Sequence, residues 1–270
     1  MEQNKEESTV YFDELPLWSA PFGCKLLEEI QLKKNIKVLD IGFGTGFPLI
    51  ELARRLGQYG VVYGLDPNEE AMNKTNRKVQ HYDLKNVRTF VGVAEKMPFR
   101  DAYFDLIVSN NGLNNASDMK IALSETFRVA KPGAPLIFTA NLPHTMIEFY
   151  EIFRSVLLAF VLKDENGRIS KHIAERRKSV EELSSLVRNA GFEIQKIDED
   201  KFHLDFIDGT TFLNHSFIRN AFLDSWKKIV SSSDVRRVML QLEKNLNSYS
   251  DQNGSLKLTI PFACVCCTKP

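Results

Sequence analysis

Strand-like and helix-like segments alternate along residues 36–141, and this alternation constrains the fold more than any other feature of the sequence. IKVLDI (36–41) and FDLIVSN (104–110) are typical of buried strands, whereas PLIELARRLG (48–57) has the apolar spacing of an amphipathic helix. Regular alternation of this kind predicts right-handed crossovers and a parallel sheet that is covered on both faces. We therefore expect an α/β fold built on a doubly wound sheet, with helices on both faces.

The composition excludes several classes of protein. Of 270 residues, 43% are hydrophobic, which is enough for a full core without disulfides or metal. The 35 acidic and 35 basic residues balance, so we expect a small-molecule partner and no nucleic acid. The longest apolar stretch, SVLLAFVL (155–162), is far shorter than the ~20 residues of a membrane span. The polar, acidic start MEQNKEESTV is unlike a secretory signal and predicts a cytoplasmic protein.

The cysteines indicate structural thiols rather than metal ligands. Cys264, Cys266 and Cys267 lie in FACVCC (262–267), without the CxxC pairs or histidine partners of a zinc site. We expect no metal, and we expect this tail to be a buried strand in which cysteine serves as a small hydrophobic residue.

The stretch LDIGFGTGFP (39–48) predicts the end of a strand, a tight turn and the start of a helix. Gly42, Gly44 and Gly46 are spaced G-x-G-x-G, and Phe47 stands where the third glycine of the dinucleotide fingerprint belongs. No Lys-Ser/Thr pair follows a suitable glycine, so a triphosphate-binding loop is not indicated either. A turn with a purely structural role is the alternative.

Two carboxylates flank this turn in the predicted sheet. A negative charge at Asp40 would repel a pyrophosphate and favour an ammonium or sulfonium cation. Asp66 ends the next strand, where a carboxylate commonly accepts hydrogen bonds from a ribose, although before Pro67 it could instead cap the following helix. Ligands bind beyond the carboxyl ends of parallel strands, so the loops after residues 41, 66, 92, 110 and 141 should converge on one site.

Together with GVAEKMPFRDAYFDLIVSN (92–110) and FRVAKPGAPLIFT (127–139), these residues resemble the class I S-adenosylmethionine-dependent methyltransferases. The branch most similar contains the ubiquinone and menaquinone C-methyltransferases. The resemblance covers residues 36–140, and more loosely SVEELSSLVRNAGFEI (179–194). It implies a Rossmann-like sheet, mostly parallel with an antiparallel last strand, the cofactor S-adenosyl-L-methionine, and a small-molecule methyl acceptor.

The resemblance also implies roles for the glycine turn and its carboxylates. In that family the residues that match Asp40, Gly42, Gly44 and Gly46 surround the methionine part of the cofactor. The acid that matches Asp66 holds the ribose.

Further roles are implied for two later loops. The residues that match Ala94 and Glu95 border the adenine, and those that match Asn110 and Asn111 lie beside the methionine and the reacting centre. Many relatives carry an aspartate where Val93 stands, so either Glu95 or backbone carbonyls would replace that acceptor. A solvated charge is the alternative for Glu95.

Methyl transfer from a sulfonium is an in-line displacement, so the protein mainly aligns the acceptor and excludes water. A base helps when the acceptor is a hydroxyl or an activated carbon, and His144, just after the fifth predicted strand, is the candidate catalytic residue; a surface histidine is the alternative. Tyr11 and Trp18 are expected to lie over the cofactor mouth, where aromatic rings would shield the sulfonium. Trp18 could instead pack the first helix on the sheet.

Apolar segments at 145–162 and 211–248 predict helical lids over an apolar or aromatic acceptor, with a buried core or a homodimer interface as the alternative. The pocket candidates are Phe149, Phe153, Phe212 and Trp226. The basic cluster GRISKHIAERRK (167–178) is interpreted as a solvated helix face.

These assignments divide the chain into an N-terminal lid segment (1–35), a cofactor-binding core (36–142), a helical lid (143–178), two stretches that complete the sheet (179–200 and 251–270) and a helical insertion (201–250). Two other functions stay open at this point. One is a nicotinamide-dependent oxidoreductase on a similar sheet, and the other is a non-catalytic cofactor-binding protein.

Overall fold

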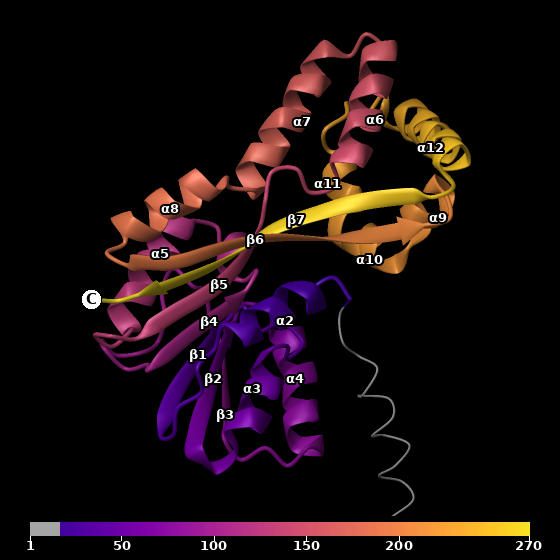
Figure 1. Ribbon diagram of the computed structural model, residues 1–270. Helices are drawn as coiled ribbons and strands as arrows, with labels where there is room; N and C mark the ends of the chain where they lie inside the picture. Colours follow the sequence, from indigo (N-terminus) through magenta and orange to yellow (C-terminus); the bar gives the residue numbers. More distant parts are fainter. Residues whose placement is uncertain (1–16) are drawn as a thin grey trace, which may run out of the picture. The chain divides into compact units, whose positions relative to one another are not determined.

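The computed structural model describes residues 17–270, except for the side chains of residues 163–166. The chain divides into two compact units (Figure 1). The first unit contains the described residues up to Asn141, together with Ser179–Asp200 and Phe262–Pro270. The second contains Leu142–Lys178 and Lys201–Pro261, so the division falls within two long strands, β6 and β7. Tyr11 lies outside the described residues.

A seven-stranded sheet has the order β3-β2-β1-β4-β5-β7-β6. The strands are β1 (Ile36–Ile41), β2 (Gly60–Asp66), β3 (Val87–Val91), β4 (Leu106–Asn110), β5 (Pro135–Asn141), β6 (Glu193–Phe206) and β7 (Leu256–Thr268). The first five strands pair in parallel, whereas β7 runs antiparallel to β5. The predicted Rossmann-like sheet, mostly parallel with an antiparallel last strand, is therefore confirmed.

Helices cover both faces of this sheet in the first unit. They are α2 (Ala20–Glu28), α3 (Leu49–Leu56), α4 (Glu69–His81), α5 (Met119–Val129) and α8 (Val180–Asn189), with short turns η1 (Gly57–Tyr59) and η2 (Leu113–Asn115). Apolar residues of α2 and α3 pack against β1, β2 and β4, and α5 lies with α8 on the opposite face (Figure 1). All five residues of β4 are buried, which explains why its sequence reads as a continuous apolar run.

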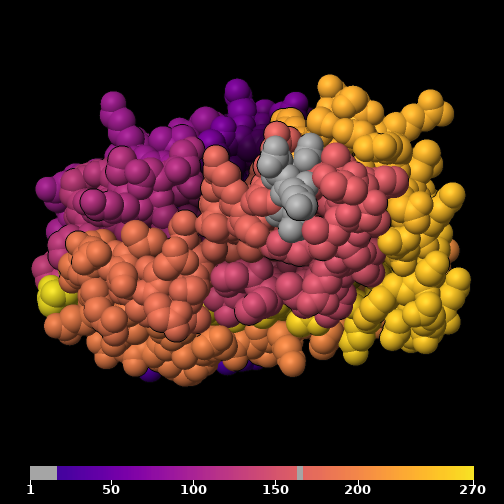
Figure 2. Space-filling model, turned by 90° about the horizontal axis from the view of Figure 1, so that it is seen from above, coloured from indigo at the N-terminus to yellow at the C-terminus, as the bar shows by residue number. Residues whose placement is uncertain are grey.

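The second unit is mainly helical. It contains α6 (Ile147–Ala159), α7 (Lys163–Arg176), α9 (Gly209–Asn214), α10 (Ser216–Ile218), η3 (Arg219–Leu223), α11 (Asp224–Lys227) and α12 (Val235–Asn253). In Figure 2 the yellow atoms of α12 border the pink atoms of α6, and the two helices are in contact. No helix in the described part of the chain is long and apolar enough to cross a membrane.

Aromatic side chains form the core of the second unit. Phe149, Phe153, Phe212 and Trp226 are fully buried. The rings of Phe149 and Trp226 stack with centroids 4.1 Å apart, and Trp226 Nε1 donates to Tyr150 Oη at 3.1 Å. These side chains fill space against one another, so the core interpretation of the apolar segments applies to them and the pocket interpretation does not.

One predicted boundary was wrong. The helical insertion predicted at 201–250 begins inside β6, which runs to Phe206, so residues 201–206 are not helical. Residues 209–227 form several short helical segments, because the backbone at His215 is extended and interrupts the helix that begins after Asp208. The cysteine-rich tail is the predicted strand, and Cys264 and Cys267 are buried in it.

Phe149→Ala is expected to lower the free energy of unfolding by about 3–5 kcal/mol, because it leaves a cavity beside Trp226. Leu158→Ala, on the same helix at a residue that is 56% exposed, should change it by less than about 0.5 kcal/mol. Denaturant unfolding followed by Trp226 fluorescence, in a Trp18→Phe background, measures both. Equal effects of the two substitutions would contradict the aromatic core.

Candidate functional site

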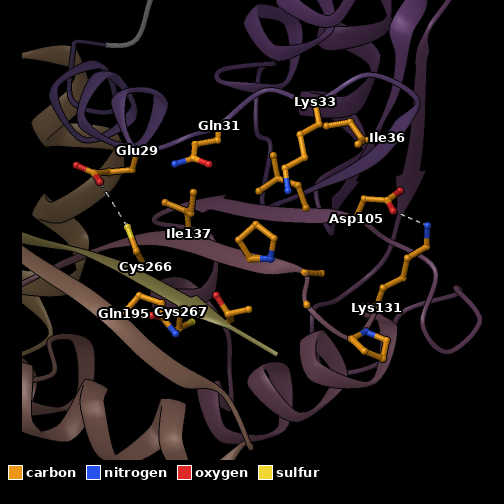
Figure 3. Close-up of a pocket in the computed structure, with 16 residues that line it drawn as sticks. Glu29, Gln31, Lys33, Ile36, Asp105, Lys131, Ile137, Gln195, Cys266 and Cys267 are labelled. Carbon is orange, nitrogen blue, oxygen red and sulfur yellow. Dashed lines mark hydrogen bonds and ion pairs between the residues drawn. The ribbon is translucent and has the colours of Figure 1, made fainter. Parts of the chain in front are cut away.

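Two cavities within the described residues of the first unit have the same volume, about 390 Å³, so size does not decide which of them is the functional site. One lies at the amino ends of β1 and β5, where Ile36 and Pro135 line it (Figure 3). Several of its polar groups already have partners, since Lys131 Nζ lies 2.5 Å from Asp105 Oδ1 and the Cys266 thiol lies 3.9 Å from Glu29 Oε2. The sites of parallel sheets lie at the opposite, carboxyl ends of the strands.

The other cavity lies at those carboxyl ends. Its wall contains residues from the predicted loops after 41, 66, 92 and 110, and this convergence is confirmed. No residue of the loop after 141 is in that wall. Trp18, Ser19 and the segment 115–117 complete it. The volume falls within the roughly 300–1,000 Å³ typical of small-molecule sites, so this carboxyl-end cavity is the candidate site.

The glycine turn after β1 brings two stretches of backbone into contact. Gly42, Gly44 and Gly46 have φ angles of 76°, 53° and 108°. A Cβ atom on Gly42 would lie 2.5 Å from the Cα of Gly112, so a side chain cannot fit between the two segments. The turn is therefore packed against the loop after β4 and presents bare backbone at the cavity.

Asp66 joins the glycine turn to the end of β2. Its Oδ2 accepts a hydrogen bond from Gly44 N at 2.8 Å, and its Oδ1 accepts one from Asn68 N at 2.8 Å. The side chain of Asn68, and not that of Asp66, caps α4 by accepting a hydrogen bond from Ala71 N at 3.1 Å. The helix-cap interpretation of Asp66 is therefore wrong, and its carboxylate instead lies in the cavity wall.

Asp40 is a fully buried carboxyl group. Neither of its oxygens has a hydrogen-bond partner among the described residues. Burial, and then the charge of Asp66, raise the pKa of Asp40 to about 8 from an ordinary 3.8. Asp40 therefore holds a proton at neutral pH, and a nearby cation would stabilise its ionised form.

Asn110 and Asn111 follow β4 and line the same cavity. Asn110 is fixed at both ends, because its Nδ2 donates to Ser19 O at 3.0 Å and its Oδ1 accepts from Thr139 Oγ1 at 3.0 Å. Asn111 has a φ angle of 60°, and its buried side-chain oxygen and nitrogen have no partner within the described part of the chain. Asn111 thus offers an unused donor and an unused acceptor beside the cavity.

The loop after β3 forms another part of the wall. Gly92 N donates to Asp66 O at 3.0 Å, and Val93, Ala94 and Glu95 follow along the cavity. Glu95 Oε1 accepts from Asp118 N at 3.0 Å, at the start of α5. Glu95 is therefore half-buried and tied to the start of α5 through one oxygen, and its role at the adenine stays a prediction.

Several residues of the site were not predicted. Ser19 and Thr139 hold Asn110, and Gly112 allows the close approach of the glycine turn. Thr139 is a polar residue inside the apolar run LIFTA (136–140), and Asn111-Gly112 is a common turn dipeptide, so both carried a sequence signal. Ser19 holds Asn110 through its backbone carbonyl, which every residue has, so no sequence signal could have identified it.

Trp18 lines the carboxyl-end cavity, as expected for the N-terminal segment. Phe22 is fully buried and lies edge-on to Phe262 with ring centroids 4.8 Å apart, so it packs the first helix on the sheet. His144 is exposed and is not in the wall of the cavity. Its catalytic role stays a prediction.

Comparison with known proteins agrees with this geometry. Residues 32–191 match a family model described as a methyltransferase domain. A demethylmenaquinone methyltransferase from Geobacillus sp. is 31% identical over 62% of this chain and 74% of that protein. The YcgJ protein from Bacillus subtilis has a similar structure, with a TM-score of 0.60 and 19% identity over 92% of this chain and 97% of its own.

A SAM-dependent methyltransferase from Aquifex aeolicus has a TM-score of 0.51 and 27% identity over 65% of this chain and 81% of its own. The family model covers more than half of the 270 residues. This match agrees with the strand order and with the glycine turn. The resemblance to class I S-adenosylmethionine-dependent methyltransferases is thereby confirmed, and the chain belongs to the methyltransferase domain family.

Proposed function

We propose that this enzyme transfers a methyl group from S-adenosyl-L-methionine to a small apolar or aromatic acceptor, with the carboxyl-end cavity as its cofactor site. The observation that carries the proposal is the fully buried carboxyl group of Asp40 beside the glycine turn, which has no hydrogen-bond partner among residues 17–270. A carboxyl group there is unfavourable for a pyrophosphate and favourable for a ligand with a cationic end. The family match supports the same cofactor.

The residues around the cavity fit the methionine end of this cofactor. Asp40 would compensate the ammonium group, and the unused donor and acceptor of Asn111 suit a polar amino-acid end. Gly42 and Gly44 line the cavity and would let the ligand approach the backbone closely. Gly46 is not in the wall, and a Cβ atom there would instead lie 2.7 Å from Ile50 Cδ1.

The nucleoside end fits the other half of the wall. Each carboxylate offers about four acceptor sites, so Asp66 keeps sites for a ribose diol after binding two backbone N–H groups. We assign Ala94 and Glu95 to the adenine side. Since Val93 offers no side-chain acceptor, the free oxygen of Glu95 or backbone carbonyls would receive the adenine amino group.

When bound, the cofactor supplies a methyl group on a positively charged sulfur that is open to in-line displacement. The protein then has to position the acceptor and exclude water. Asn110, fixed by Ser19 and Thr139, is rigid enough to hold one side of the reacting centre. We keep His144 as the candidate base for an acceptor that must lose a proton.

The acceptor class is taken from the relatives. The Geobacillus protein is named for the methylation of demethylmenaquinone, and its similarity extends over 74% of its length. We therefore propose a quinone-type aromatic acceptor. Phe47 in place of the third glycine, together with Asp40, disfavours the nicotinamide alternative.

The remaining expectations are proposals as well: a cytoplasmic enzyme that binds no nucleic acid, with a homodimer as an open alternative. The balance of 35 acidic and 35 basic residues supports the absence of a nucleic-acid partner. Sedimentation of the purified protein would determine its oligomeric state.

Methyl transfer is tested by incubating the enzyme with labelled S-adenosyl-L-methionine and a panel of acceptors. We expect label transfer to demethylated naphthoquinones and matching formation of S-adenosylhomocysteine, with none for nucleic acid or protein. Tight cofactor binding without transfer to any acceptor would contradict the catalytic proposal and favour a non-catalytic cofactor-binding protein.

Asp66→Ala is expected to weaken binding of S-adenosylhomocysteine by at least about tenfold, because each hydrogen bond to a charged group contributes roughly 1.5–3 kcal/mol. Asp66→Asn keeps one side-chain acceptor oxygen, so its affinity for S-adenosylhomocysteine should fall less. Titration calorimetry measures both, and Asp83→Ala, at an exposed carboxylate outside the cavity wall, is the control. Unchanged affinity in Asp66→Ala would contradict the ribose assignment.

Cofactor binding is expected to release about one proton at about pH 6.5, where both Asp40 and the ligand amine are protonated before binding. Because the pKa of Asp40 is raised on folding, its contribution to stability is full below pH 3.8 and is lost as the pH rises from there through about 8. A bound cation lowers that pKa and expels the proton.

Calorimetry of S-adenosylhomocysteine binding in buffers of different ionisation enthalpy counts the released proton. Asp40→Asn should release none, and its folded state should lose less stability than the wild type between about pH 4 and pH 8. Equal proton release in the two proteins would contradict the role of Asp40.

A further inference from the structure

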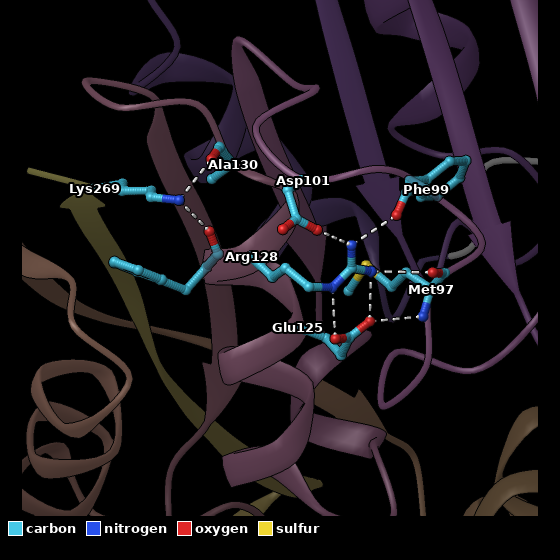
Figure 4. Close-up of polar contacts among 8 residues, drawn as sticks. Met97, Phe99, Asp101, Glu125, Arg128, Ala130 and Lys269 are labelled. Carbon is cyan, nitrogen blue, oxygen red and sulfur yellow. Dashed lines mark hydrogen bonds and ion pairs between the residues drawn. The ribbon is translucent and has the colours of Figure 1, made fainter.

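The wall segment 92–101 connects β3 to β4 without forming a helix or strand of its own. Its first residues line the carboxyl-end cavity, on the side that we assign to adenine. A segment of this kind has no internal hydrogen-bond ladder, so its position depends on contacts with neighbouring elements. At its far end the ring of Phe99 packs against Phe90 and Phe104. The side-chain hydrogen bonds there come largely from Arg128, in the last turn of α5 (Figure 4).

Arg128 uses all of its hydrogen-bond donors. Nε and Nη2 each donate to Glu125 at 2.8 Å, and Nη1 donates to Asp101 Oδ1 at 2.7 Å. The remaining donors reach the backbone of the wall segment, with Nη1 donating to Phe99 O at 2.7 Å and Nη2 to Met97 O at 3.2 Å. These five bonds match the five N–H groups of a guanidinium, which lysine cannot reproduce.

Glu125 closes the arrangement from the other side. Its Oε2 accepts a hydrogen bond from Met97 N at 3.0 Å while both oxygens bind Arg128, so both backbone groups of Met97 are held by this pair. The hydrogen bonds from Arg128 are the largest cause of a lowered pKa at Glu125, which therefore stays ionised at neutral pH. The pair thus forms a charged clamp on the segment, two residues beyond Glu95.

The near end of the segment is held independently. Gly92 N donates to Asp66 O, and Glu95 Oε1 accepts from Asp118 N. Between these bonds and the clamp at Met97, the residues that face the cavity cannot move outward without breaking charge-assisted hydrogen bonds. The wall is therefore fixed before any ligand enters, which reduces the conformational cost of binding.

We propose that Arg128 and Glu125 are positioning residues that set the base-side wall of the cofactor cavity and thereby its selectivity for adenine. This inference rests on the proposed function, because it takes the cavity to be the site of the S-adenosyl group. Neither residue lines the cavity, so both act only through the wall segment.

The test compares Arg128→Lys and Glu125→Ala with the wild type and with Arg55→Lys, which alters an exposed Arg55–Glu51 pair outside the wall. Calorimetry measures the dissociation constants of S-adenosylhomocysteine and of its hypoxanthine analogue, in which a carbonyl replaces the adenine amino group. We expect the two clamp variants to bind S-adenosylhomocysteine about tenfold more weakly and to lose most of the preference for adenine. Arg55→Lys should match the wild type.

Hydrogen exchange at the Met97 amide provides a readout in the absence of any ligand. The exchange rate should rise in both clamp variants while amides in β1 keep their protection, which separates wall movement from general destabilisation. Glu125→Gln keeps an acceptor for Met97 N, so the Met97 amide should exchange more slowly in this variant than in Glu125→Ala.

An unchanged ratio of the two dissociation constants in the clamp variants would overturn the inference, as would a wild type that binds both bases equally. Failure of the wild type to bind S-adenosylhomocysteine at all would instead refute the proposed function. In that case faster exchange at Met97 in the variants would still show that Arg128 and Glu125 hold the wall segment. Their proposed role in cofactor selectivity would be refuted.

Discussion

Parallel pairing of β1 with β2 and with β4 is the constraint on which the candidate site depends. Ile41 is in register with Leu65, so the turns that follow these two strands begin side by side. The hydrogen bond from Gly44 N to Asp66 is possible because of that register, and the contact between Gly42 and Gly112 follows from the pairing of β1 with β4. The cavity is thus a consequence of strand order.

The carboxyl group of Asp40 then determines which ligand charge suits this cavity. The fold alone serves many chemistries, so function has to be argued from the site. Asp40 is buried without a partner among the described residues, and a buried polar group without a partner is unfavourable unless a ligand compensates it. A cation would compensate it by stabilising its ionised form, whereas a pyrophosphate would oppose that ionisation. The turn is therefore suited to a nucleoside with a cationic amino-acid end.

Features that depend on local pattern could be predicted from the sequence. The buried strands read as apolar runs, and the glycine spacing placed the turn and its two carboxylates. Features that depend on distant partners could not be predicted. The DEDKFHLDF end of β6 is rich in charged residues and half exposed, so it lacks the signal of a buried strand. The bond from Asn110 to Ser19 joins residues 91 positions apart through a backbone carbonyl, and the clamp of Arg128 on Met97 depends on how a loop folds over α5.

Direct binding to the purified wild-type protein tests which ligand the glycine turn holds. Titration calorimetry with S-adenosyl-L-methionine, S-adenosylhomocysteine and NAD, under identical conditions, separates the candidates. The account predicts binding of the two sulfur nucleosides and no binding of NAD. Binding of NAD in place of the sulfur nucleosides, or of none of the three, would contradict it.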